Sequence, residues 1–322
     1  MLINKQIKQA EMAYHSIFDR IAREDPALKR GFKQQGYAGT LEAILDETED
    51  VISPHKRKSK NVNLILHPPR IIRAYLDYKI QNPSAPEIEE LLRDSIQLGL
   101  DIYKGEERAA KELEELRYKT IETGNSVILE KDVIQNSDGI TWRATNPALS
   151  IDTAHDLAVL AKGESVLFLA MAHGGVAAGM DTYLRYCDYT GADNSIFYAA
   201  RFSTTKFWDK YPQVSSSEIA YLREQSQDRR IVLFDEDRQS GKTLDTARHF
   251  FSYYLLPQEE IIVVSNLDQR SESEKSRAEK KADKIGGYDN ARVNKKPGYI
   301  LYSNKLNKKE KDKNYFIFST AE

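Results

Sequence analysis

The chain has 322 residues, of which 40% are hydrophobic and 30% are charged, and its formal net charge at pH 7 is −2. It is long enough for one large or two modest domains, and the small net charge provides no overall field to attract nucleic acid or a membrane surface. The single cysteine, Cys187, excludes an internal disulfide; no apolar run reaches membrane-spanning length and the first residues lack the apolar core of a signal peptide, so the cytoplasm is the expected compartment.

Residues 1–123 are predicted to form a mostly helical N-terminal region. The run from Ser84 to Glu87 has the pattern of a helix capping box, and apolar residues recur behind it at helical spacing. Residues 106–117 are rich in Glu, Lys, Ala and Leu, which favour helices. A basic cluster, residues 55–60, is interpreted either as a solvated loop or as a patch that contacts phosphate or nucleic acid.

Residues 124–322 are predicted to form an α/β domain with its core at 149–270. Residues 125–142 are expected to form a hairpin with strands at 126–129 and 139–142. Beyond them, short apolar runs alternate with amphipathic segments, which favours parallel strands joined by right-handed crossovers. Ligands of such sheets bind at the carboxyl ends of the strands, and three polar loops of this region are expected at those ends.

The first polar loop follows a predicted strand that begins at Ser165. It carries His173, Gly174 and Gly175, and an amphipathic run follows. Glycines at such a turn let the backbone approach an anion closely, and an imidazole can donate a hydrogen bond to it. The alternative is an ordinary glycine turn with a loop histidine that binds nothing.

The second polar loop follows a predicted strand at 195–202. It is rich in polar and aromatic residues, among them Lys206 and Trp208, and Arg201 precedes it. Cationic side chains here could meet an anion, and aromatic side chains could exclude water from a reacting centre. An equally weighted alternative is a hairpin connection whose aromatic residues only pack.

The third and most informative loop follows the apolar run from Ile231 to Phe234. Three acids come next, Asp235, Glu236 and Asp237, and a small polar turn with Gly241 leads into an amphipathic run. Such a turn offers backbone N–H groups, hydroxyls and a positive helix end to an anion. Carboxylates beside a phosphate-binding turn suit a ligand that carries both sugar hydroxyls and phosphate.

Two other interpretations of this third loop remain. A nucleotide-binding P-loop needs a glycine five positions before Gly241, where this chain has Glu236, and a carboxylate there would repel the phosphates. A simple strand-to-helix turn capped by Ser240 or Thr243 would bind no ligand.

The third loop resembles the signature of type I phosphoribosyltransferases, and its Gly-Lys-Thr ending is closest to the hypoxanthine-guanine type. The resemblance implies a Rossmann-like parallel sheet that binds phosphoribosyl pyrophosphate, or a related phosphorylated ribose, with Mg²⁺. It implies a ribose and metal site at Asp235 and Glu236, directly or through water, with Asp237 as a further catalytic candidate. The residues implied to contact the 5′-phosphate are Arg238, Gln239, Ser240, Gly241, Lys242 and Thr243. The residues implied to contact pyrophosphate are His173, Gly174 and Gly175. A flap that closes over the site is implied to contain Arg201, Lys206 and Trp208.

The centre of the third loop departs from this family. Purine-type members usually have an aspartate where Gln239 stands, and an amide is neither an acid nor a base. Asp237 and Arg238 replace apolar residues. The expected reaction is transfer of a phosphoribosyl group to an unidentified acceptor with release of pyrophosphate. The alternatives are a sensor without turnover, and a nucleotide-directed effector in a defence or toxin system; a nucleic-acid contact and a homo-oligomer stay open.

Overall fold

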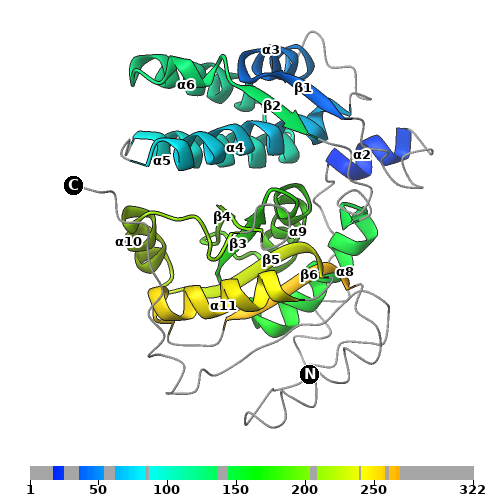
Figure 1. The fold of residues 1–322 in the computed structure, drawn as a ribbon. Coiled ribbons are helices and arrows are strands. Elements are labelled where there is room, and N and C mark those ends of the chain that lie inside the picture. Colours follow the sequence, from blue (N-terminus) through cyan, green and yellow to red (C-terminus); the bar gives the residue numbers. More distant parts are fainter. Residues whose placement is uncertain are drawn as a thin grey trace. The chain divides into compact units, whose positions relative to one another are not determined.

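A computed structural model describes residues 17–24, 36–53, 62–83, 87–135, 144–203, 209–238, 241–257 and 261–268 (Figure 1). The chain divides into two compact units, Met1–Ala148 and Leu149–Glu322. The basic cluster at 55–60 and the start of the expected capping box at Ser84 lie outside the described residues.

The N-terminal unit is mainly helical, as the sequence predicts. Its helices are α2 (Ile17–Glu24), α3 (Leu41–Ile52), α4 (Asn63–Gln81), α5 (Glu87–Lys104) and α6 (Ala109–Glu122). Helix α4 packs against α3 and α5, and α5 packs against α6. Thr40 caps α3 by accepting a hydrogen bond from the Ala43 N–H at 3.2 Å, and the buried residues of α3 recur at helical spacing to form its core face.

A two-stranded antiparallel sheet completes this unit, and it corrects the predicted hairpin. Strand β2 (Asp132–Gln135) pairs with β1 (Tyr37–Thr40), whereas Ser126–Ile128 is a turn of 3-10 helix, η2, and not a strand. The expected partner at 139–142 lies outside the described residues. Because β2 pairs with a strand far away in the sequence, it stays with the first unit, and the division falls after Ala148 instead of after Thr123.

The C-terminal unit is an α/β fold with a four-stranded parallel sheet, an arrangement compatible with a Rossmann-like fold. Its strands are β3 (Val166–Ala172), β4 (Ile196–Arg201), β5 (Arg230–Arg238) and β6 (Ile262–Asp268). Its helices are α8 (Pro147–Leu160), α9 (Gly175–Thr190), α10 (Ser216–Gln225) and α11 (Lys242–Leu255).

Apolar packing holds the sheet between its helices. Every residue of β3 is buried, as expected of an inner parallel strand that is covered on both faces. The ring of Phe168 lies 5.7 Å from that of Phe197 and 5.4 Å from that of Phe234, so the neighbouring strands β4, β3 and β5 share one aromatic cluster. Strand β5 runs four residues past the predicted end at Phe234, because its acidic end continues to pair with β6.

The strand order is β4-β3-β5-β6. From β3 the chain crosses by α9 to β4 on one side, and from β5 it crosses by α11 to β6 on the other side. The order therefore reverses between β3 and β5, and a crevice outside the carboxyl ends of two such strands is the usual ligand position in open α/β sheets. Among the described residues, no helix is long and apolar enough to cross a membrane.

Candidate functional site

The first and third polar loops meet at the carboxyl ends of β3 and β5. Gly174 precedes α9, and a Cβ atom placed on it would lie only 1.7 Å from the Glu236 Oε1 atom. The Glu236 side chain of β5 therefore lies against the backbone of the glycine turn, in a space that no other residue type leaves open. Glu236 is 6% exposed, so this contact is shielded from water.

Gly175, the next residue, is less constrained. A Cβ atom there would lie 3.4 Å from the Phe234 carbonyl oxygen and 3.5 Å from the Asp235 Cα atom, which are ordinary contacts. Of the two glycines, only Gly174 is required by the position of a neighbouring side chain. The peptide bond between Ala172 and His173 is cis. His173 is partly exposed, although both of its ring nitrogens are buried.

The glycine turn is also the amino-terminal end of α9. Gly174 occupies the N-cap position and has no side chain to accept a hydrogen bond from the first turn. The N–H groups of a first turn carry a partial positive charge that favours an anion. In this structure the nearest anion is the Glu236 carboxylate beside Gly174.

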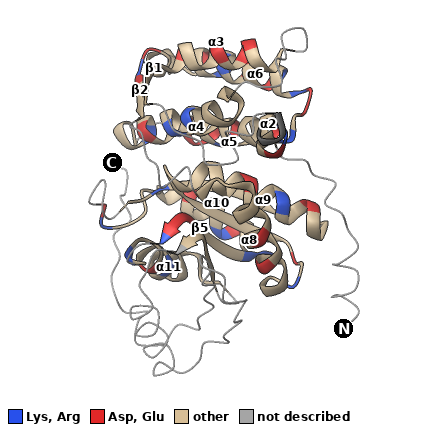
Figure 2. Ribbon diagram, turned by 90° about the vertical axis from the view of Figure 1, so that its right-hand side faces the viewer, with Lys and Arg blue, Asp and Glu red and all other residues tan. Residues whose placement is uncertain are grey.

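The acids at the end of β5 form a local concentration of negative charge, visible as red residues near the end of that strand (Figure 2). Asp235 accepts a hydrogen bond from the Glu236 N–H at 3.1 Å. Loss of hydration, and then the neighbouring Glu236 and Asp237 carboxylates, raise the pKa of Asp235 well above its usual range. A cation at this position would relieve the repulsion that contributes to the shift.

The same acids carry carboxylate oxygens of the kind that could hold a divalent cation. Mg²⁺ prefers hard oxygen ligands, and it commonly uses one or two carboxylates together with water and substrate oxygens. Asp235 and Glu236 supply two such carboxylates. Within the ranges that the structure describes, no group of three or more His, Cys, Asp or Glu side chains gathers as a metal site.

Arg238, the last residue of β5, lies against the turn that precedes α11. A Cβ atom on Gly241 would be 2.6 Å from the Arg238 Nε atom and 2.7 Å from Nη2, and the φ angle of Gly241 is +80°. Glycine is favoured here by the backbone conformation, and any larger residue would also require the guanidinium to move. Arg238 Nη2 also lies 3.2 Å from Asp245 Oδ1 in the first turn of α11.

The remaining residues of the expected phosphate turn are only partly described. Lys242 is exposed and Thr243 is half-buried at the start of α11, whereas Gln239 and Ser240 lie outside the described residues. Sequence reasoning missed Asp245. Its signal was an acid in the first turn of a predicted helix, a position that the helix dipole favours.

The expected flap is partly described as well. Arg201 ends β4, its Nε atom lies 4.0 Å from Asp209 Oδ2, and its carbonyl oxygen accepts a hydrogen bond from the Gln213 N–H at 2.8 Å. Asp209 closes the loop by accepting a hydrogen bond from the Ser203 N–H at 3.1 Å. Lys206 and Trp208 are outside the described residues.

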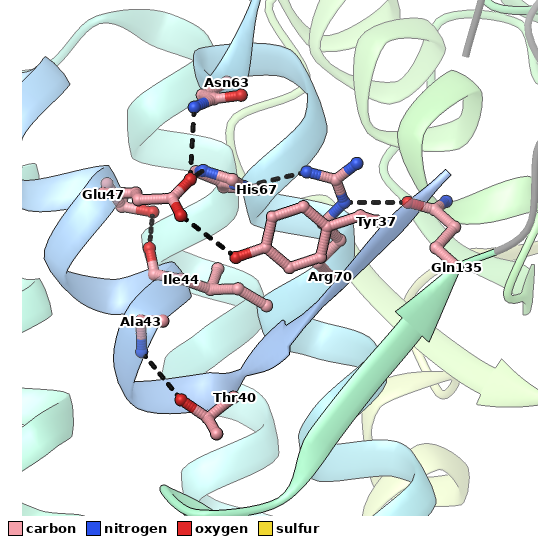
Figure 3. Close-up of polar contacts among 10 residues, drawn as sticks. Tyr37, Thr40, Ala43, Ile44, Glu47, Asn63, His67, Arg70 and Gln135 are labelled. Carbon is pink, nitrogen blue, oxygen red and sulfur yellow. Dashed lines mark hydrogen bonds and ion pairs between the residues drawn. The ribbon is translucent and has the colours of Figure 1, made fainter. Parts of the chain in front are cut away.

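The N-terminal unit contains a polar network that the sequence did not reveal (Figure 3). The Glu47 carboxylate of α3 accepts hydrogen bonds from His67 Nε2 of α4 at 3.0 Å and from the Tyr37 hydroxyl of β1 at 3.3 Å. Arg70 lies 3.2 Å from His67 Nδ1, donates to Gln135 Oε1 of β2 at 2.8 Å, and stacks 4.1 Å above the Tyr37 ring. The network joins four elements, α3, α4, β1 and β2. Both ring nitrogens of His67 have partners within it, which leaves neither nitrogen to act as a base.

A second cluster in that unit joins α5 and α6. Asp101 is fully buried and contacts Arg108 at 2.7 Å and Gln97 at 2.9 Å. Burial and the neighbouring Asp101 carboxyl raise the pKa of Glu112 to about 7. The polar partners of these acids lie on α5, on α6 and at the residue that precedes α6, so the cluster is structural.

A comparison of the chain with family models, with curated proteins and with solved structures found no match in any of the three. The function must therefore be inferred from the geometry at the carboxyl ends of β3 and β5.

Proposed function

We propose that the C-terminal unit binds phosphoribosyl pyrophosphate with Mg²⁺ and transfers the phosphoribosyl group to an acceptor, releasing pyrophosphate. The observation that carries this proposal is the contact between Glu236 and Gly174. It brings the acidic end of β5 and the glycine turn after β3 together at the point where the strand order reverses. These two segments are the ones that the motif resemblance assigns to one ligand.

The chemistry asks the chain mainly to place charges. The turn at Gly174 and Gly175 would let backbone groups approach a pyrophosphate once the Glu236 carboxylate, which lies beside Gly174, turns toward Mg²⁺. The start of α11 with Gly241 and Thr243 would bind the 5′-phosphate. Bound Mg²⁺, held by Asp235 and Glu236, would neutralise the charge that develops on the departing pyrophosphate. Preorganised groups of this kind provide electrostatic stabilisation without covalent catalysis.

Binding is the first test. Isothermal titration calorimetry of the full chain with phosphoribosyl pyrophosphate should show binding that needs Mg²⁺. The double variant Asp235→Asn/Glu236→Gln should lose it. Asp228→Asn, an exposed acid before the opposite end of β5, is the matched control and should bind as the wild type does. No binding by the wild type, or full binding by the double variant, would show that the proposal is wrong.

A second candidate function is a sensor that binds the ligand without turnover. It is favoured by Gln239, which stands where the purine-type enzymes carry a proton-transferring acid. Pyrophosphate release, measured over a panel of nucleobases with the wild-type chain, separates the two functions. Release with any base excludes the pure sensor, whereas Mg²⁺-dependent binding without release over the whole panel favours it.

A further inference from the structure

A buried hydroxyl beside the candidate site is unpaired. Ser265 of β6 is 2% exposed, and its Oγ atom makes no hydrogen bond with any residue that the structure describes. Buried polar groups in native proteins are nearly always hydrogen-bonded, because a buried group without a partner has given up its bonds to water and gained nothing in return. The unpaired hydroxyl of Ser265 therefore needs a physical reason.

The register of the sheet places Ser265 opposite Asp235. The two residues are paired positions on the adjacent parallel strands β6 and β5. Side chains alternate between the two faces along each strand, so paired positions on neighbouring strands project to the same face. The Ser265 hydroxyl and the Asp235 carboxylate are thus neighbours on one face of the sheet. Asp235 accepts a hydrogen bond from the Glu236 N–H, and because a carboxylate has about four acceptor positions it can accept another.

We propose that Ser265 is a positioning residue for the metal site, and that its hydroxyl donates a hydrogen bond to the Asp235 carboxylate when this carboxylate holds Mg²⁺. The inference rests on the proposed function, because it assigns a partner to an acid that would hold the metal. Carboxylates that bind a metal are usually oriented by hydrogen bonds from a second group. One Asp235 oxygen would face Mg²⁺ and the other would accept from Ser265, so ligand binding removes the cost of the unpaired hydroxyl.

The test makes two measurements on the full-length chain, and they should change in opposite directions in Ser265→Ala. Calorimetric titrations of phosphoribosyl pyrophosphate at a series of Mg²⁺ concentrations give the Mg²⁺ requirement, which should rise about 10-fold, as for loss of a group that orients a metal ligand. In urea unfolding without ligand, Ser265→Ala should be at least as stable as the wild type, because it removes an unpaired polar group. Ser265→Thr keeps the hydroxyl and should restore the wild-type Mg²⁺ requirement.

Thr153 of α8 provides the matched control. Its Oγ1 atom is also buried without a partner among the described residues, but it lies on a helix and not beside the acids of β5. Thr153→Val removes this hydroxyl and keeps the branched shape of the side chain. It should leave the Mg²⁺ requirement unchanged.

A purely structural role for Ser265 predicts a different pattern. An unchanged Mg²⁺ requirement in Ser265→Ala overturns the inference, and so does a lower urea midpoint, because the hydroxyl would then have a partner in the ligand-free protein. Circular dichroism reports the folding of each variant; if Ser265→Thr does not fold, the comparison of Ser265→Ala with Thr153→Val decides alone. Wild-type binding with an unchanged requirement in Ser265→Ala refutes this inference only, whereas absence of wild-type binding refutes the proposed function and this inference with it.

Discussion

The contact between Gly174 and Glu236 permits a quantitative prediction. In Gly174→Ala the new Cβ atom would lie 1.7 Å from Oε1, 2.2 Å from Cδ and 2.6 Å from Oε2 of Glu236. The carboxylate would have to move by more than 1 Å, although Glu236 is only 6% exposed and has little free space. Overpacking of this kind costs about 1–3 kcal/mol. We therefore expect Gly174→Ala to lower the free energy of unfolding of the C-terminal unit by about 2 kcal/mol.

The second arm of the experiment removes the side chain that causes the overlap. In a Glu236→Ala background, Gly174→Ala should cost nothing, and it should even stabilise by about 0.5 kcal/mol, because Gly174 has helical backbone angles that alanine adopts readily. The coupling free energy between the two positions is then about 2.5 kcal/mol, within the range for residues in contact.

Urea unfolding followed by circular dichroism measures these differences, and hydrogen exchange of β3 and β5 assigns the transition to the C-terminal unit. Gly175→Ala is the matched control in the same turn: its Cβ atom would make only ordinary contacts, so its effect should be small and equal in both backgrounds. An equal penalty for Gly174→Ala with and without the Glu236 carboxylate would refute the reasoning.

Three further predictions concern stability. The folded pKa of Glu112 is about 7, above its unfolded value, so Glu112 contributes to the free energy of unfolding at low pH and this contribution is lost as pH rises from about 4.5 to 7. Urea unfolding of the Glu112→Gln variant should show that the resulting slope, about 1 kcal/mol per pH unit, becomes flatter, and an unchanged slope contradicts the prediction. Burial and the neighbouring Arg70 lower the pKa of His67 to about 3, so the free energy of unfolding falls as pH drops below about 6.5. In unfolding experiments between about pH 7 and 4, His67→Gln should remove this decrease. If the decrease persists in the variant, other groups cause it. Phe168→Ala opens the aromatic cluster of the sheet and should cost about 3–5 kcal/mol in unfolding of the C-terminal unit, and a loss below about 1 kcal/mol would mean that the three rings do not pack as one core.

The two pH effects lie in the same unit and have opposite signs. Between pH 6.5 and 4.5 the protonation of Glu112 stabilises the folded state, while protonation of His67 in the unfolded state opposes it. The wild type should therefore show a shallow dependence in this window. The two single variants should diverge from it in opposite directions.

Local sequence determined the elements of the C-terminal unit. Short apolar runs with β-branched and aromatic residues indicate the strands β3, β4, β5 and β6. Glycines after β3, and acids and a glycine after β5, indicate the turns that follow these strands. These features depend on neighbouring residues along the chain, so a single sequence reveals them.

The tertiary structure decided which of these segments meet. Strand pairing joins residues distant in the chain, and periodicity carries no information about the partner: β2 pairs with β1 and not with the segment that follows it, and β3 lies beside β5 although β4 comes between them in sequence. The contact of Glu236 with Gly174 follows from that placement. Side-chain chemistry could be predicted residue by residue, whereas the site exists only where the order of the strands brings two loops to one edge of the sheet.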